Sequence, residues 1–241
     1  MDSAGASPQF TTTHWSVVIA AGAGASLKAS EALAQLYRVY WYPLYAYVRR
    51  KGYSPDEAPD LTQEFFARML AGNYFSTLDR RKGKFRSFLL AAMEHFLAKE
   101  WTRAHRLKRG GGQTLVSLDD DTAEQRYRLE PSHDLTPEKI FERRWAMTLL
   151  EQTMNRLGEE HGAAGKTQLF ERLKTFLAGD RPDCSYAQAG AELAMSEGAV
   201  KVAVHRLRRR YGELLRDEIA QTVARPEEID EEIRYLFQTL R

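Results

Sequence analysis

Apolar residues recur at helical spacing through most of this chain, and no other feature of the sequence limits its fold so strongly. Over residues 30–51, for example, Leu36, Tyr40 and Leu44 fall on one face of a helix. Alternation of apolar and polar residues, which would indicate strands, is scarce. The sequence therefore predicts an all-α protein.

Residues with capping and chain-breaking chemistry mark where the helices begin and end. Ser54 and Thr136 can accept hydrogen bonds from the first N–H groups of the helices that follow them, and Pro55 suits a first helical turn. Besides residues 30–51, helices are predicted at about residues 54–71, 84–106, 137–157, 165–178, 185–194, 197–216 and 227–239.

A break in the helical pattern divides the chain. Three glycines at residues 110–112 precede an aspartate-rich stretch without helical periodicity, which predicts a flexible acidic linker between two helical domains. The predicted segments are an N-terminal extension (1–29), a first domain (30–110), the linker (111–136), a second domain (137–220) and an amphipathic tail (221–241).

Charge is distributed unevenly, although the 241 residues carry a formal net charge of only +2. Residues 80–109 hold ten lysines and arginines against two glutamates. Residues 117–142 and 217–241 are acidic, with eight and seven carboxylates against three basic residues each. This asymmetry indicates surfaces for different partners.

The stretch SYAQAGAELAMSEGAVKVAVHRLRRRY, residues 185–211, combines a short helix, a tight turn and a longer basic helix. Its small residues allow the two helices to cross closely, which is typical of a helix-turn-helix. Ala194 stands where such turns often have glycine, so we expect mild backbone strain there. The residues expected to face inward are Val200, Val204, Leu207 and Tyr211.

The outer side of the second helix in this stretch is the first candidate for contact with DNA. Lysine and arginine bind guanine edges or phosphates in the major groove, and the N–H groups at residues 196–198 can bind a phosphate. A solvated amphipathic helix is the alternative. The outward candidates on helical spacing are Lys201, His205, Arg208 and Arg209.

Residues 83–109 form a second basic stretch that alternates cations with aromatic residues. Cations follow a nucleic-acid backbone, and exposed aromatic rings stack on unpaired bases. We expect Phe85, Phe88 and Phe96 to lie in the core, because they share a face. His95, Trp101 and the basic end of the helix are the better candidates for contact with a single strand.

A third stretch, residues 54–70, places acidic and small residues on one side of a helix. Such a face is usually only solvated, but it can also dock on a basic helical partner. Its members are Asp60, Gln63, Glu64 and Ala67.

Several kinds of site are not indicated. There is no glycine-rich phosphate loop, HExxH motif, cysteine cluster or persuasive carboxylate pair, so no catalytic residue, metal site or cofactor is predicted, and an enzyme is the least favoured class. GAAGKT, residues 162–167, lacks the first glycine and the preceding strand of a phosphate loop. The single cysteine, Cys184, cannot form an intrachain disulfide. With no long apolar run and no signal peptide, we expect no membrane insertion and a cytoplasmic protein.

In this order, the three stretches resemble the conserved regions of an extracytoplasmic-function (ECF) sigma factor, the minimal class of bacterial RNA polymerase sigma subunits. DEAPDLTQEFFARML resembles the family's region 2.2, and KFRSFLLAAMEHFLAKEWTRAHRLKR resembles the segment that melts and reads the minus-ten element. The stretch over residues 185–211 resembles the region-four helix-turn-helix. His95 and Glu94 depart from the asparagine and arginine that the family often has.

The resemblance implies core RNA polymerase and promoter DNA as partners, with nucleoid association when bound to polymerase. The first domain would bind the clamp helices of the largest polymerase subunit through Asp60, Gln63, Glu64 and Ala67. The residues implied for minus-ten recognition and melting are Lys84, Arg86, His95, Lys99, Trp101, Arg103 and Arg106, with the preceding loop at about residues 76–84. Those implied for the minus-thirty-five element are Ser196, Glu197, Gly198, Lys201, His205, Arg206, Arg208 and Arg209.

The resemblance also implies that the linker runs toward the RNA exit path and that the second domain lies near the polymerase flap region. An ordinary helix-turn-helix regulator is the main alternative, and an adaptor that binds only protein is another. The regulator of the chain, an anti-sigma factor or a kinase, stays open. The tail can bind such a regulator or the polymerase, but its apolar face favours packing on its own domain.

Overall fold

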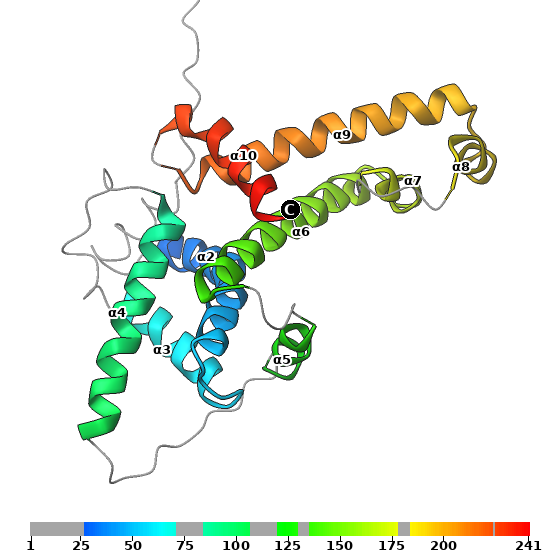
Figure 1. Ribbon diagram of the computed structural model, residues 1–241. Coiled ribbons are helices and arrows are strands. Elements are labelled where there is room, and N and C mark those ends of the chain that lie inside the picture. Colours follow the sequence, from blue (N-terminus) through cyan, green and yellow to red (C-terminus); the bar gives the residue numbers. More distant parts are fainter. Residues whose placement is uncertain (1–26, 71–83, 107–119, 130–134, 178–183, 224) are drawn as a thin grey trace, which may run out of the picture. The chain divides into compact units, whose positions relative to one another are not determined.

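The computed structural model describes residues 27–70, 84–106, 120–129, 135–177, 184–223 and 225–241 (Figure 1). All regular elements among these residues are helical, which confirms the predicted all-α class. In chain order the elements are α2 (Leu27–Arg50), α3 (Glu57–Leu70), α4 (Phe85–Arg106), α5 (Asp120–Arg128), α6 (Pro137–Ala163), α7 (Thr167–Leu173), η2 (Lys174–Phe176), α8 (Tyr186–Leu193), α9 (Glu197–Ala220), η3 (Pro226–Glu228) and α10 (Ile229–Thr239).

The predicted helix starts are confirmed at the two caps. Ser54 Oγ accepts a hydrogen bond from Glu57 N–H at 3.2 Å, and the Glu57 carboxylate accepts one from Ser54 N–H at 2.9 Å. These bonds lower the pKa of Glu57. Thr136 Oγ likewise accepts from Lys139 N–H at 3.3 Å. The N-terminal extension and the loop at residues 76–83 lie outside the described residues.

One expectation was wrong: α5 forms inside the stretch where no regular structure was predicted. Nine residues seldom form a stable helix alone, so contacts with α2 must hold this one. Glu124 accepts hydrogen bonds from Tyr45 Oη at 2.7 Å and Arg49 Nε at 2.9 Å, and Tyr127 packs edge-on against Tyr45. Burial opposes ionisation of Glu124, but these hydrogen bonds outweigh it and lower its pKa.

The residues fall into two compact units by packing. The first unit comprises Met1–Thr148 and Ile219–Arg241, and the second comprises Leu149–Glu218. The first half of α6 and everything after residue 218 therefore pack within the first unit. The five segments expected from the sequence stay predictions.

Helix α2 is the centre of the first unit. Every residue from Trp41 to Val48 is buried, so this part of the helix is enclosed on all sides. Aromatic contacts join it to its neighbours: Tyr40 lies 5.4 Å from Phe85 of α4, measured between ring centroids, and α3 meets α4 through a 5.7 Å contact of Phe65 with Phe96. These contacts fix α3 and α4 and hence the polar faces that the two helices expose.

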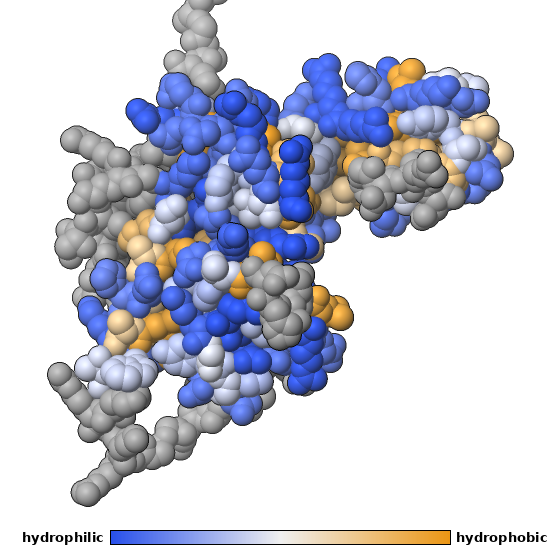
Figure 2. All heavy atoms as spheres, in the orientation of Figure 1, coloured by the Kyte–Doolittle hydropathy of each residue, from blue (hydrophilic) through white to orange (hydrophobic). Residues whose placement is uncertain are grey.

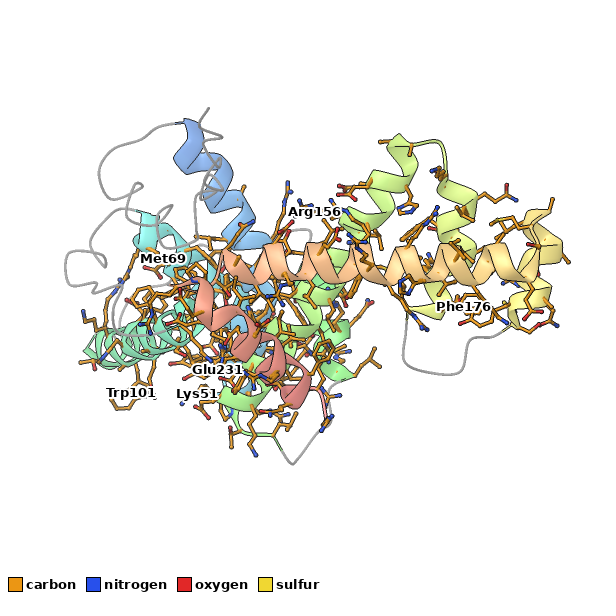
Figure 3. All side chains as sticks on the ribbon, turned by 90° about the horizontal axis from the view of Figure 1, so that it is seen from above. Lys51, Met69, Trp101, Arg156, Phe176 and Glu231 are labelled. Carbon is orange, nitrogen blue, oxygen red and sulfur yellow. The ribbon has the colours of Figure 1, made fainter. Side chains whose placement is uncertain are left out.

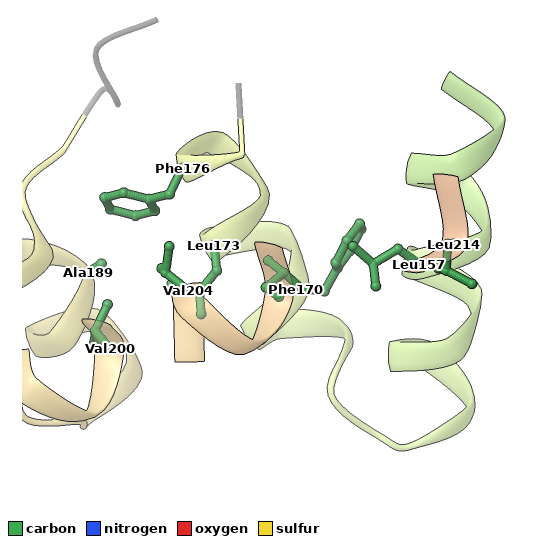
Figure 4. Packing of buried hydrophobic residues seen from close by; sticks show 9 residues of the cluster. Leu157, Phe170, Leu173, Phe176, Ala189, Val200, Val204 and Leu214 are labelled. Atoms are coloured by element: carbon green, nitrogen blue, oxygen red, sulfur yellow. The ribbon is translucent and has the colours of Figure 1, made fainter. Parts of the chain in front are cut away.

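The second unit has its own apolar core, drawn in Figure 4. It gathers side chains from α6, α7, η2, α8 and α9 around the inward face of α9. Gly158 of α6 allows a close approach, because a Cβ there would lie only 2.8 Å from the Phe170 ring. The core residues are Leu157, Phe170, Leu173, Phe176, Ala189, Val200, Val204, Leu207 and Leu214.

Candidate nucleic-acid interface

The predicted helix-turn-helix corresponds to α8, α9 and the short turn between them. Ala194 closes α8 with φ at +52°, the only positive φ of a non-glycine residue in the described ranges, so the strain expected there is confirmed. A Cβ on Gly190 would lie 2.6 Å from the Met195 carbonyl oxygen. The turn can therefore pack this tightly only against a glycine.

The start of α9 is open to an anion. Ser196 Oγ accepts a hydrogen bond from Ala199 N–H at 3.2 Å, which confirms it as the cap. Glu197 and Gly198 are exposed, and nothing lies within 4 Å of where a Cβ of Gly198 would stand. The N–H groups of these two residues have no partner within the helix, so they can donate to a phosphate.

The inward face of α9 agrees with the prediction. Val200, Val204 and Leu207 are at most 4% exposed. Tyr211 is half-buried, its hydroxyl donates to the Leu150 carbonyl oxygen at 3.3 Å, and burial raises its pKa to about 12. This apolar contact along one side fixes which side chains α9 turns outward.

The outward face of α9 is cationic around an exposed apolar residue. Val202, His205, Arg206 and Arg209 follow one another at helical spacing and are all exposed, Val202 by 51%. Within the described part of the chain, no hydrogen bond or ion pair holds the side chain of His205 or Arg206. Figure 2 shows a mostly hydrophilic surface along α9. Val202 is not among the residues predicted from the sequence, although its position on the helical wheel, between the cations, could have indicated it.

Other cations of α9 have partners inside the unit. Arg208 donates from Nη2 and Nε to the Phe176 carbonyl oxygen at 2.8 and 3.3 Å, which ties η2 to α9. Lys201 pairs with Glu197 at 2.7 Å, and Arg209 pairs with Glu213 at 3.0 Å. The last two pairs are exposed, so they are weak enough for a phosphate to replace the carboxylate.

The C-terminal half of α4 exposes the second group of predicted residues. His95 and Lys99 are exposed, Trp101 is 58% exposed, and Arg103 lies 3.5 Å from Glu100. Figure 3 shows the Trp101 side chain projecting away from α4. Arg106 is the last residue of this helix, and its side chain lies outside the described residues.

A hollow of about 440 Å³ lies beside Trp101 in the first unit. Burial lowers the pKa of Lys51 at its edge, but hydrogen bonding with Tyr47 and the nearby carboxylates outweigh this and raise it, so the ammonium stays charged. This hollow could not be predicted from the sequence, because its walls come from separate helices. The lining residues are Tyr47, Lys51, Tyr53, Glu94, Leu97, Ala98, Trp101 and Thr102.

The N-terminal end of α4 differs from its other end. Arg86 is 3% exposed and Lys84 is half-buried, because α10 lies over both. These two predicted residues are therefore separated from Trp101 by most of the length of α4 and are covered by carboxylates, whereas His95 and Lys99 are exposed.

The acidic side of α3 also has the expected orientation. Phe65, Phe66 and Met69 are buried on its inner side. Glu64 pairs with Arg68 of the same helix and lies 3.9 Å from Arg103 of α4. The side chains of the predicted polymerase-binding set are half-buried at Asp60, Gln63 and Glu64 and exposed at Ala67.

The family model described as ECF sigma factor matches residues 29–217. The chain belongs to this family. As an ECF sigma factor it is a sigma subunit of RNA polymerase and acts in transcription initiation with core polymerase and promoter DNA as its partners. No curated protein and no solved structure matches the chain.

The matched region includes all three predicted stretches of this sigma factor but ends before α10. Sigma factors initiate transcription and are not known as enzymes. Among the described residues, no group of three or more histidine, cysteine or carboxylate side chains is placed to hold a metal ion. No helix in the described part of the chain is both long and apolar enough to cross a bilayer.

Proposed function

We propose that this sigma factor brings core RNA polymerase to promoters through two separate DNA-binding surfaces. The outward face of α9 binds duplex DNA at the minus-thirty-five element. The C-terminal half of α4, with the hollow beside Trp101, holds the unpaired strand at the minus-ten element. The observation that carries the proposal is the outward face of α9, which is exposed and cationic while the opposite side of the helix is core.

Duplex binding suits the chemistry of that face. Arginine donates two hydrogen bonds to a guanine edge, and an aliphatic side chain such as Val202 contacts a thymine methyl group. The open N-terminus of α9 and the exposed Lys201 and Arg209 bind phosphates, which fixes the helix in the groove without sequence preference. Arg208 supports the face by holding η2.

Strand binding suits the end of α4. An exposed indole ring offers a stacking surface for a base, with a stabilisation of about 1–3 kcal/mol per stacked base. Lys51, which lines the same hollow as Trp101, and the exposed cations of α4 attract the phosphates of the same strand. Stacking is independent of base identity, so selectivity has to come from neighbouring polar groups such as His95.

Polymerase binding is proposed for α3. The half-buried Asp60, Gln63 and Glu64 and the exposed Ala67 lie on one side of the helix, and the two carboxylates complement basic residues on the clamp helices of the largest subunit. The second unit would lie near the flap region. A cytoplasmic location follows from these partners, and control by an anti-sigma factor or a kinase stays a prediction.

The test is transcription from fragments of bacterial genomic DNA by core polymerase, with and without the protein. New and discrete start sites that depend on the protein are expected, and they give the promoter sequence directly. If no start sites form while the protein alone binds duplex DNA, the chain acts as an ordinary helix-turn-helix regulator and the proposal is wrong.

Replacing Arg206 by alanine tests the role of α9. We expect weaker promoter binding by the polymerase complex and, if Arg206 contacts a phosphate, a slope of log K against log salt that is shallower by about 0.9. Arg216→Ala is the matched control, because Arg216 is exposed on the same helix but lies ten residues, about 15 Å, farther from its start than Arg206. Equal losses for both variants would contradict the assignment of this face.

A further inference from the structure

The acidic helix α10 covers the cationic start of α4. Glu232 is 1% exposed and pairs with Arg86, and its other carboxylate oxygen lies 2.7 Å from Lys84 Nζ. Glu231, which lies on the same helix and is labelled in Figure 3, is 3.2 Å from Lys84 Nζ. Two adjacent carboxylates of α10 thus neutralise two cations that begin a DNA-binding helix.

Aromatic rings complete this contact. The Arg86 guanidinium lies over the rings of Tyr235 and Trp145, at 4.2 and 4.9 Å from their centroids. Tyr235 also donates its hydroxyl to Glu142 of α6, and Glu142 lies 3.8 Å from Arg86 Nε. This guanidinium is attracted to any anion that replaces Glu232.

Burial of an apolar face does not by itself account for the contact between α10 and the start of α4. Leu236 of α10 is fully buried, but Phe237 on the same helix is 48% exposed. Ionic and cation–π contacts join α10 to Lys84 and Arg86 at the start of α4. Burying charges costs desolvation, so an ion pair stabilises little beyond what apolar residues of the same size would give. If Glu232 leaves, Arg86 is left without its carboxylate, so another anion has to take that place.

We propose that α10 is an internal competitor for promoter DNA: Glu231 and Glu232 occupy the positions at Lys84 and Arg86 that phosphates of the melted strand take when the sigma factor is active. The proposal rests on the proposed role of α4 in binding that strand. It assigns a function to residues 226–241, which lie outside the region matched by the family model. Release of α10 adds two phosphate contacts to those of the exposed half of α4.

The experiment is fluorescence anisotropy of a labelled single-stranded oligonucleotide of mixed sequence, titrated with the full-length chain at several salt concentrations. The variant Glu231→Gln/Glu232→Gln is expected to bind more tightly than the wild type. The slope of log K against log salt should be steeper by about 1.4, because two phosphate contacts on a single strand contribute about 0.7 each. Glu231→Gln alone should give about half of that change. Because the Glu231 side chain is 67% exposed, the single variant Glu231→Gln leaves the fold intact.

Glu227→Gln is the matched control. It removes the same charge from the same segment, but Glu227 is exposed, and the ion pairs of Lys84 and Arg86 with α10 are made by Glu231 and Glu232. Equal affinities and slopes for wild type, control and tail variants would overturn the proposal. Absence of strand binding in every variant would also overturn it. The role as an initiation factor is judged separately, by the start sites formed with core polymerase.

Discussion

Replacing Ala194 by glycine should stabilise the turn between α8 and α9. The left-handed conformation at Ala194, with φ at +52°, costs a residue with a Cβ about 1–2 kcal/mol. Glycine removes that cost but loses more backbone entropy on folding, by about 0.4–1 kcal/mol. The difference predicts a gain of about 0.5–1 kcal/mol in the free energy of unfolding.

Urea unfolding followed by far-ultraviolet circular dichroism measures this gain. Ala191→Gly is the control, because Ala191 is an exposed residue of α8 with ordinary helical geometry. There the same substitution should lower the free energy of unfolding by about 0.5–1 kcal/mol. The two substitutions remove the same methyl group at positions three residues apart, yet they should change the free energy of unfolding in opposite directions.

A loss at Ala194 equal to the loss at Ala191 would refute the reasoning. It would mean that the turn does not hold Ala194 in the left-handed conformation in solution. The tight packing of the turn on Gly190 would then need another explanation, since both features depend on the same path of the backbone.

Three further changes test other contacts. Gly190→Ala should lower the free energy of unfolding by about 1–3 kcal/mol in the same urea assay, because the added methyl group would meet the Met195 carbonyl oxygen and the backbone has to shift. The stability that Glu124 contributes should be present above its ordinary pKa of about 4.5 and be lost as pH falls through its lowered folded-state pKa; Glu124→Gln should abolish that part of the pH dependence in acid unfolding. Trp101→Ala should weaken binding of a single-stranded oligonucleotide by about 1–3 kcal/mol with little change in unfolding, because the ring is 58% exposed.

Local features of the chain were predictable because their causes are local. Helix positions follow from apolar spacing and caps, as at Ser54 and Ser196. The inward face of α9 follows from the spacing of Val200, Val204 and Leu207, and the strain at Ala194 follows from its place in a tight turn. In each case the residues that decide the structure lie within a few positions of one another.

Features that depend on distant partners were not predictable. Helix α5 forms because Glu124 meets Tyr45 and Arg49, which precede it by more than 70 residues. The hollow beside Trp101 has walls from α2 and α4, and nothing in either helix alone indicates it. A spacing pattern describes one helix, whereas these contacts depend on how several helices pack.

Arg86 shows why a charge pattern does not establish a binding surface. Sequence spacing places it among the cations of α4, and the family resemblance implies contact with DNA for all of them alike. A carboxylate 146 residues farther along the chain takes up its charge, while Lys99 and Arg103 on the same helix stay exposed. Phosphate and carboxylate satisfy a guanidinium through the same hydrogen-bond geometry. A guanidinium suited to a strand phosphate is therefore equally suited to the carboxylates of an acidic tail.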